Sequence, residues 1–395
     1  MMRIRSILFL LFLSIQLPLS AQLFNDQDFR RSVQTGLDQM YNFSFESAGK
    51  SFYQLLEAHP DHPAPYFLLA LNRWWQTYLS ATMPDYYGYI GDKLKKAEDR
   101  LKLIEGKPGY EQEYIFFKFM IHALDARAHS FRNEWWPAMN SAKKLIDPME
   151  KSLLFVGQAD EFYMLAGLYH YYVETYHQMY PVIRPILSFF PDGDAELGLQ
   201  ELVKASGSSH IAQMEAKYFL GTIYNDEIFQ YGKGVSVTRD LARRYPNNTW
   251  FQNDLAHALV LNRQFAEAKP IIDQLIKAYE RQGGANSKNI NSKSSRFTTY
   301  LMIRVYHNQG RWLMESQKDY EAALAAFDQS NRMAQLASVE EDFYLPANQY
   351  YKGLCFDFLG RRAEAVAAYE EVLDLEENTR FENQAKANIE TAAKE

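Results

Sequence analysis

The chain has 395 residues, of which 47% are hydrophobic and 15% are aromatic. That apolar content excludes a chain disordered by composition, and the length favours several domains or an elongated repeat array over one compact core. A formal net charge of −7 argues against a nucleic-acid partner, whose phosphates require a basic surface. The single cysteine, Cys355, excludes a disulfide framework within the chain.

Residues 1–21 have the features of a secretory signal peptide. Arg3 and Arg5 precede an uncharged apolar run from Ile7 to Leu17, and Ser20-Ala21 offers small residues for cleavage. The run is too short to span a bilayer, which takes roughly 20 residues in a helix, and no later stretch is long and apolar enough. We expect an exported protein, periplasmic or extracellular, with no integral membrane span. An uncleaved N-terminal anchor is the alternative.

After this segment, small, alanine, aromatic and proline residues recur in a fixed order. Gly36 is followed after 12 residues by Ala48, after four more by Phe52, and after eight more by Pro60. Small residues let two helices approach closely, the aromatic ring fills the space toward the next pair, and proline ends the second helix. The order therefore predicts paired helices joined by short turns.

The same order returns along the chain in five partial copies. They comprise Gly36 to Pro60; Gly353, Ala365 and Tyr369; Ala256, Ala268 and Ile272; Ala323 and Phe327; and Gly221 with Gly234, where one extra residue intervenes. Ala70 also lies 34 residues after Gly36, the usual period of such arrays. A chain of helix-forming composition with this many copies is predicted to be a repeat array.

Eight helix pairs and a terminal helix are predicted in chain order. The pairs cover about 27–57, 64–105, 110–147, 159–206, 212–245, 249–280, 297–336 and 343–375, and a capping helix covers about 379–394. Long connections are expected from Tyr78 to Gly91 and from Tyr180 to Asp194. Arg281 to Arg296 is predicted to be a mobile basic loop.

These residues resemble the tetratricopeptide repeat over most of 27–375, most specifically over 212–375. The resemblance implies an all-α, right-handed α-solenoid of about eight helix pairs with a C-terminal capping helix. It also implies a concave groove, lined by the first helix of each pair, that binds a protein or peptide partner. We divide the chain into the signal peptide (1–21), irregular repeats (22–206) and more regular repeats with the capping helix (207–395).

Groove positions follow from the resemblance by counting from the small residue of each pair. They are Tyr218, Thr222, Asn225, Asn253, His257, Tyr350 and Asp357. Amide, hydroxyl and aromatic groups suit recognition of a peptide backbone. We expect this groove, rather than the loop at 281–296, to carry the principal contact.

A narrower resemblance covers Gly167 to Leu202. There Pro181, Pro185, Phe189, Phe190, Gly193, Asp194, Gly198 and Leu202 are similar to a stretch in tetratricopeptide proteins linked to inclusion-body clearance.

His170, Glu174 and His177 share one helical face, a spacing that could bind zinc or iron. Five tyrosines surround them in the sequence, so we interpret the three as part of a structural polar network with tyrosine hydroxyls. Asp194 is predicted to cap the helix that begins at Ala195. We expect no metal and no cofactor.

No nucleophile-elbow, zinc-protease or paired-cysteine motif is present in the sequence, and we expect a scaffold rather than an enzyme. The alternative is a carbohydrate-binding or enzymatic helical protein that uses an aromatic pocket in residues 64–206. Adjacent aromatic pairs such as Trp74-Trp75 and Trp135-Trp136 would contribute exposed rings to such a site.

Overall fold

A computed structural model describes residues 26–77, 84–179, 192–284, 298–337, 344–375 and 379–392, and over these ranges the protein contains helices and turns but no strand. The predicted signal peptide and most of the predicted basic loop lie outside the described residues. So do residues 180–191 of the second long connection. Across the described helices, none is long and apolar enough to cross a membrane.

The first half of the array contains four helix pairs. Its helices are α1 (Gln27–Tyr41), α2 (Phe45–Ala58), α3 (Pro63–Thr77), α4 (Pro84–Ile104), α5 (Glu111–Ser130), α6 (Trp135–Lys143), α7 (Ile146–Ser152), the short 3-10 helix η2 (Leu153–Phe155), α8 (Phe162–Met179) and α10 (Ala195–Ser208). The expected long connection to Gly91 is wrong, because α4 already begins at Pro84. Proline is favoured in the first turn of a helix, where its missing N–H has no partner to lose.

The second half continues the pairing to the C-terminal end. Its helices are α11 (Gln213–Thr222), the π-helix η4 (Ile223–Glu227), α12 (Tyr231–Arg244), α13 (Thr249–Leu261), α14 (Phe265–Arg281), α15 (Thr299–Trp312), the π-helix η6 (Leu313–Gln317), α16 (Tyr320–Ala337), α17 (Tyr344–Phe358), α18 (Arg362–Asp374) and α19 (Thr379–Ala392). The eight predicted pairs and the terminal helix are thus confirmed. The predicted loop start at Arg281 is wrong, since Arg281 still belongs to α14.

Within a pair, the small residue of the first helix lies directly under an aromatic ring of the second. A Cβ added at Gly36 would come within 2.2 Å of the ring of Phe52, and one at Gly353 within 2.3 Å of the ring of Tyr369. Such distances leave no room for a methyl group. Close helix approach in these pairs therefore depends on the absence of a side chain.

The two π-helices explain the extra residue in two of the pairs. Gly221 precedes Gly234 by 13 residues, one more than the usual 12, and η4 lies between them. In the same way η6 lies between Gly310 and Ala323. A π-helix adds one residue to a turn without ending the helix. The pair geometry is preserved after each insertion, because a Cβ at Gly310 would again meet a ring, that of Phe327, at 2.5 Å.

The turn inside a pair also has a constant geometry. A residue with left-handed backbone conformation follows the first helix of six pairs, at Phe43, Asn133, Phe229, Arg263, Lys318 and Gly360. This conformation ends a helix by redirecting the chain, and glycine adopts it at the lowest cost. Only the last pair places a glycine there, so the other five turns are held by the packing of the helices that they connect.

Helices α8 and α10 approach each other most closely, backbone to backbone. A Cβ at Gly198 would lie 2.5 Å from the backbone nitrogen of Tyr171, and one at Gly193 would lie 2.5 Å from that of Glu174. The glycines of the narrower resemblance thus have a packing role. The side chain of Asp194 accepts from the backbone N–H of Leu197, which confirms it as the predicted cap of α10.

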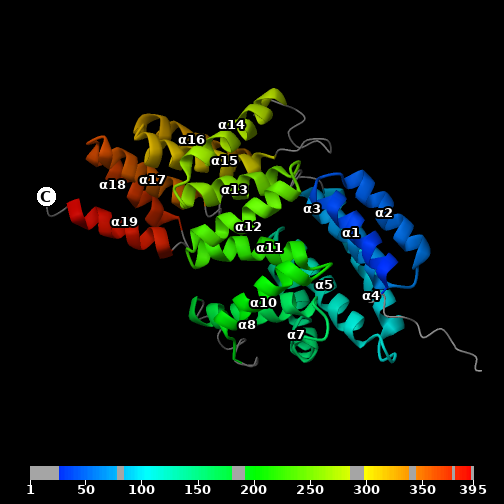
Figure 1. The fold of residues 1–395 in the computed structure, drawn as a ribbon. Helices are drawn as coiled ribbons and strands as arrows, with labels where there is room; N and C mark the ends of the chain where they lie inside the picture. Colours follow the sequence, from blue (N-terminus) through cyan, green and yellow to red (C-terminus); the bar gives the residue numbers. More distant parts are fainter. Residues whose placement is uncertain are drawn as a thin grey trace, which may run out of the picture.

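The array has its first pairs at one end and α17–α19 at the other, with α11–α13 between them (Figure 1). One hydrophobic core extends from Phe29 in α1 to Tyr344 in α17, and it crosses the predicted boundary at 206/207 without interruption. Two smaller clusters fill the last pairs. One contains fully buried Cys355, where burial raises the pKa of the thiol to about 12.

We predict that Gly353→Ala lowers stability by about 1–3 kcal/mol, since the new methyl group collides with the ring of Tyr369. That ring is held in place because its hydroxyl donates to Asp357 at 2.8 Å. Gly207→Ala in α10 is the matched control, because no heavy atom lies within 4 Å of its added Cβ. The control should be neutral or stabilising by up to about 1 kcal/mol. Equal melting temperatures for the two variants would contradict the proposed contact.

Candidate functional site

The predicted groove residues lie on the first helices of their pairs or on the π-helix that extends one of them. Tyr218 on α11 is half-buried. Its ring meets Trp75 of α3 edge-on, with centroids 6.3 Å apart, and the guanidinium of Arg127 from α5 lies 5.9 Å from its centroid. Thr222 donates back to the carbonyl of Tyr218 at 3.4 Å. Side chains of the first half of the chain therefore cover this part of the predicted groove.

Asn225 and Asn253 are 4% and 0% exposed, respectively. Asn225 belongs to η4 and faces Gly234 of α12, where an added Cβ would lie 1.9 Å from its side-chain oxygen. Asn253 accepts from Asn308 of α15 at 3.1 Å. Both amides are thus enclosed between helices, and neither presents its side chain to a partner.

His257 connects three consecutive pairs. Its Nδ1 lies 2.8 Å from the amide oxygen of Asn308, and its Nε2 lies 3.1 Å from a carboxylate oxygen of Asp226. The ring is 8% exposed, while the side chain of Asp226 is 42% exposed. His257 therefore holds the first helices of these pairs together, and Asp226 is the member of the network that solvent reaches.

A buried ion pair lies beside this network. Arg304 of α15 contacts Asp254 of α13 at 2.7 Å and donates to the hydroxyl of Tyr344 at 3.0 Å. Its guanidinium also lies 4.9 Å from the ring centroid of Trp250. Burial raises the pKa of Asp254, while the positive charge of Arg304 opposes that shift. Removing either partner would leave an uncompensated buried charge.

The last predicted groove residues, Tyr350 and Asp357, are used within the C-terminal packing. The ring of Tyr350 lies 5.5 Å from that of Phe381 in the capping helix α19. Asp357 accepts from Arg362 at 2.6 Å and from Tyr369 at 2.8 Å. The capping helix therefore covers the aromatic position, and the carboxylate joins α17 to α18.

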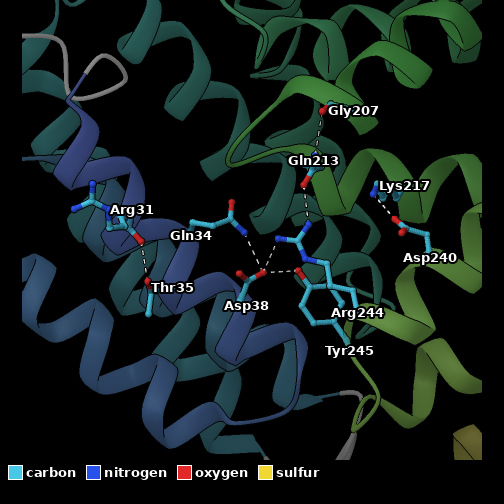
Figure 2. A network of polar contacts seen from close by, with 10 residues as sticks. All are labelled: Arg31, Gln34, Thr35, Asp38, Gly207, Gln213, Lys217, Asp240, Arg244 and Tyr245. Atoms are coloured by element: carbon cyan, nitrogen blue, oxygen red, sulfur yellow. Dashed lines mark hydrogen bonds and ion pairs between the residues drawn. The ribbon is translucent and has the colours of Figure 1, made fainter.

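A seam closes the first half of the chain onto the second. Asp38 of α1 accepts from Gln34, from Arg244 at 3.0 Å and from the hydroxyl of Tyr245 at 2.7 Å (Figure 2). Arg244 also donates to Gln213 at 3.0 Å. The contacts of Arg244 and Tyr245 with Asp38 join residues about 200 positions apart in the sequence.

The apolar part of the seam lies behind Asp38. Tyr41, 1% exposed, packs on Trp75 of α3 and on Tyr245 and Phe251 of the second half. Its hydroxyl donates to Glu215 at 3.1 Å, and its backbone carbonyl accepts from Asn248 at 2.8 Å. The seam is thus a continuous interface of rings, amides and carboxylates. No sequence period indicated it, because its two sides share no repeat relation.

His170 and Glu174 both make polar contacts with α10 or the residues at its start. His170 lies 2.7 Å from Glu201 of α10, and Glu174 accepts from the backbone N–H of Ala195 at 2.5 Å. The nearby hydroxyls of Tyr171 and Tyr172 donate to Glu227 in η4. The side chain of His177 lies outside the described residues. Within the described part, no cluster of three or more potential ligands could hold a metal ion.

The adjacent tryptophan pairs differ in exposure. Trp74 and Trp75 are each 1% exposed within α3, whereas Trp135 and Trp136 at the start of α6 are 63% and 74% exposed. In α3 both rings are enclosed. Trp75 packs on Tyr41 and Phe251 in the seam, and Trp74 packs on Phe131 and lies beside Arg127.

The architecture defines an all-helical repeat solenoid. A model of the tetratricopeptide repeat matches residues 349–379, the last helix pair. The geometry of this pair recurs along the described chain, so the array is built from tetratricopeptide-repeat (TPR)-type helix pairs.

Several solved structures are similar to this chain at low sequence identity. A search of curated proteins found no match. The human IFIT1 dimer with PPP-AAAA is 13% identical with a TM-score of 0.41, covering 85% of this chain and 69% of that one. Yeast Tom70 is 12% identical with a TM-score of 0.39, covering 91% and 88%. The P58(IPK) TPR domain is 13% identical with a TM-score of 0.25, covering 93% and 98%. Similarity at this level carries no argument about partners.

We predict that stability falls as the pH drops below about 6.5, partly through His307 of α15. This ring is 3% exposed and its Nδ1 lies 2.7 Å from the amide oxygen of Asn348. Burial, followed by the charge of Arg311, lowers its pKa well below the usual value. The unfolded chain therefore binds a proton that the folded chain does not. Stability is full above the unfolded pKa and declines below it, by up to about 1.4 kcal/mol per pH unit for one proton.

The measurement is urea unfolding between pH 7.5 and 5, with His307→Gln for comparison. The variant should show a shallower decline, although His59 and His122, whose pKa values burial also lowers, retain part of it. Identical slopes for the variant and the wild type would exclude His307 as a contributor.

Asn248 both caps α13 and contacts the other side of the seam, and we predict that a substitution can remove the second role while keeping the first. Asn248 is fully buried; its side-chain oxygen accepts from Trp250 and Phe251 at the start of α13, while its amide nitrogen donates across the seam to Tyr41. Asn248→Ser retains an oxygen that can cap α13 but loses the amide nitrogen that donates to the carbonyl of Tyr41. It should lower stability by about 1 kcal/mol. Asn248→Ala loses both roles and should cost about 2 kcal/mol. Hydrogen exchange across 27–41 should increase in both variants; unchanged exchange there would contradict the assignment.

Proposed function

We propose that this TPR protein is an exported scaffold that binds a protein partner through the exposed aromatic surface of α6. The observation that carries the proposal is the exposure of Trp135 and Trp136. Tryptophan is the side chain most enriched at the energetic centres of protein interfaces. The chain buries its other adjacent tryptophan pair, Trp74 and Trp75, but exposes these two rings to solvent. Trp135 and Trp136 are therefore a candidate contact site.

The rest of α6 has the pattern of a docking helix. Ala138 and Ser141 are buried on its inner side. Trp136, Asn140 and Lys143 are exposed and Met139 is half-buried, so these four residues form one outward stripe at helical spacing. Such a stripe presents an aromatic anchor with polar groups at its rim, as the centre and edge of an interface require.

The concave groove supports partner binding less well. Tyr218 is covered by Trp75 and Arg127, and the amides of Asn225 and Asn253 are enclosed. A peptide that entered there would have to displace contacts of the chain with itself. An outer helix such as α6 needs no such rearrangement, so binding there loses little free energy to ordering.

Export is proposed from residues 1–21, with their charged start, short apolar run and small residues at Ser20-Ala21. Cleavage would remove two positive charges and make the net charge of −7 more negative by two. The partner is therefore proposed to be a protein of the periplasm or cell exterior rather than a nucleic acid. A scaffold is proposed rather than an enzyme, since the sequence holds no recognised catalytic motif.

The carbohydrate-binding alternative would use the same two indoles, because ring faces also stack on sugars. It differs in one observable. A glycan that stacks on Trp135 or Trp136 would change the tryptophan fluorescence of the purified protein with no second protein present. Saturable changes with a panel of soluble glycans would favour this alternative.

We predict that Trp135→Ala with Trp136→Ala weakens binding by about thirtyfold or more, equivalent to roughly 2 kcal/mol. The mature chain, 22–395, carrying a photo-crosslinker at Asn140 is exposed to an envelope extract. The partner protein found by crosslinking is then purified, and its affinity for the mature chain is measured directly. Exposed surface changes of this kind seldom alter stability, so the melting temperature should hold.

Phe358→Ala is the matched control, since this ring is 61% exposed but lies in α17, at the C-terminal end of the array. The control should bind as the wild type does. If the double tryptophan variant binds the crosslinked protein with unchanged affinity, the α6 surface is not the site.

A further inference from the structure

A cavity of about 360 Å³ lies at the seam, between α1 and the turn that joins α10 to α11. Gln27, Arg30, Arg31 and Gln34 line it from one side, where their spacing places them on a single face of α1. His210 lines it from the opposite side, and Asp38 lies at its end. The volume falls in the range of small-molecule sites, roughly 300–1,000 Å³.

Arg30 is the unusual member of this lining. Among the described residues, no carboxylate lies within ion-pair distance of its guanidinium, and its Nε is buried without a hydrogen-bond partner. Its Nη1 instead lies 3.4 Å from Nε2 of His210. A guanidinium can donate only to an unprotonated ring nitrogen, so this is a weak neutral contact for a group that prefers an oxyanion.

The opposite wall is held rigidly. Glu161, 6% exposed, accepts from the backbone N–H groups of His210 at 2.8 Å, Ile211 at 3.1 Å and Ala212 at 3.0 Å. One carboxylate thereby fixes the turn that carries the His210 ring. The His210 side chain itself is exposed, and its ring contacts Nη1 of Arg30 at 3.4 Å.

The acidic groups near the cavity are already neutralised. Asp38 is paired with Arg244 and accepts from Tyr245, as Figure 2 shows. Asp28 contacts Arg31 at 3.0 Å, but the two side chains are 89% and 68% exposed. An ion pair that exposed is weak, so Arg31 is free to turn toward a ligand. The unpaired charge that remains in the cavity is positive.

We propose that this cavity binds a small oxyanion, a carboxylate or phosphate group, which Arg30 and Arg31 hold from α1 and His210 holds from the other side of the seam. Charge-assisted hydrogen bonds from the Nη groups of the two guanidiniums would hold such an anion. Because the anion contacts both sides, it stabilises the closed arrangement of the array. The site is independent of the α6 surface.

The test uses the mature chain with inorganic phosphate and, separately, with succinate as probes, each titrated against sodium chloride at matched ionic strength. Calorimetry should show saturable binding of at least one probe, and the two titrations distinguish a phosphate from a carboxylate site. Saturation should also reduce hydrogen exchange in 27–41 and around His210. No saturable binding of either probe, or binding without protection at both walls, would overturn the proposal.

Arg30→Gln should weaken the affinity at least about tenfold, since it removes the charge of the central donor. Lys50→Gln on α2 is the matched control, because it removes the same charge from an exposed position of the same helix pair. The control should bind as the wild type does. A folded Arg30→Gln variant with wild-type affinity would also overturn the proposal. If that variant unfolds instead, His210→Ala provides the second test, with the same expected loss.

Discussion

The close approach of two helices at a small residue is the constraint on which the rest of this structure depends. In the first and last pairs a glycine lies under an aromatic ring at distances that admit no Cβ. That contact sets the angle between the two helices, and the recurrence of that angle sets the curvature of the array. Between α8 and α10 the same device operates backbone to backbone, where the two helices approach each other most closely.

The curvature brings the first and second halves of the chain into contact, and the seam is its consequence. Tyr41, Trp75 and Phe251 bury rings against one another, while Asp38 and Glu215 accept from groups on the opposite half. An array of repeats usually gains stability only from neighbouring units. Here distant units also contact each other directly, through the rings and polar groups of the seam.

The two π-helices, η4 and η6, change which way the side chains at the ends of two first helices point. Each adds one residue to the end of a first helix, and each contributes a carboxylate to polar contacts with neighbouring side chains. Asp226 and Glu227 in η4 contact His257 and the tyrosines of α8. Glu315 in η6 accepts from Arg311 at 2.8 Å. Without the additional residue these side chains would rotate by about 100° around the helix axis, away from their partners.

The sequence by itself determined the helix pairs, because local signals mark them. In five of the pairs these signals include all or part of one pattern: a small residue, an alanine 12 residues later and an aromatic ring four residues after that. The sequence also determined the cap at Asp194 and the extra residue after Gly221, although not the π-helix behind it. The groove residues Asn225, Asn253 and His257 followed from counting along one pair, and counting cannot show what another part of the chain covers. Only the tertiary structure decided that Trp74 and Trp75 are buried while Trp135 and Trp136 are exposed. Those outcomes depend on contacts between residues about 40 to 200 positions apart, to which no local spacing corresponds.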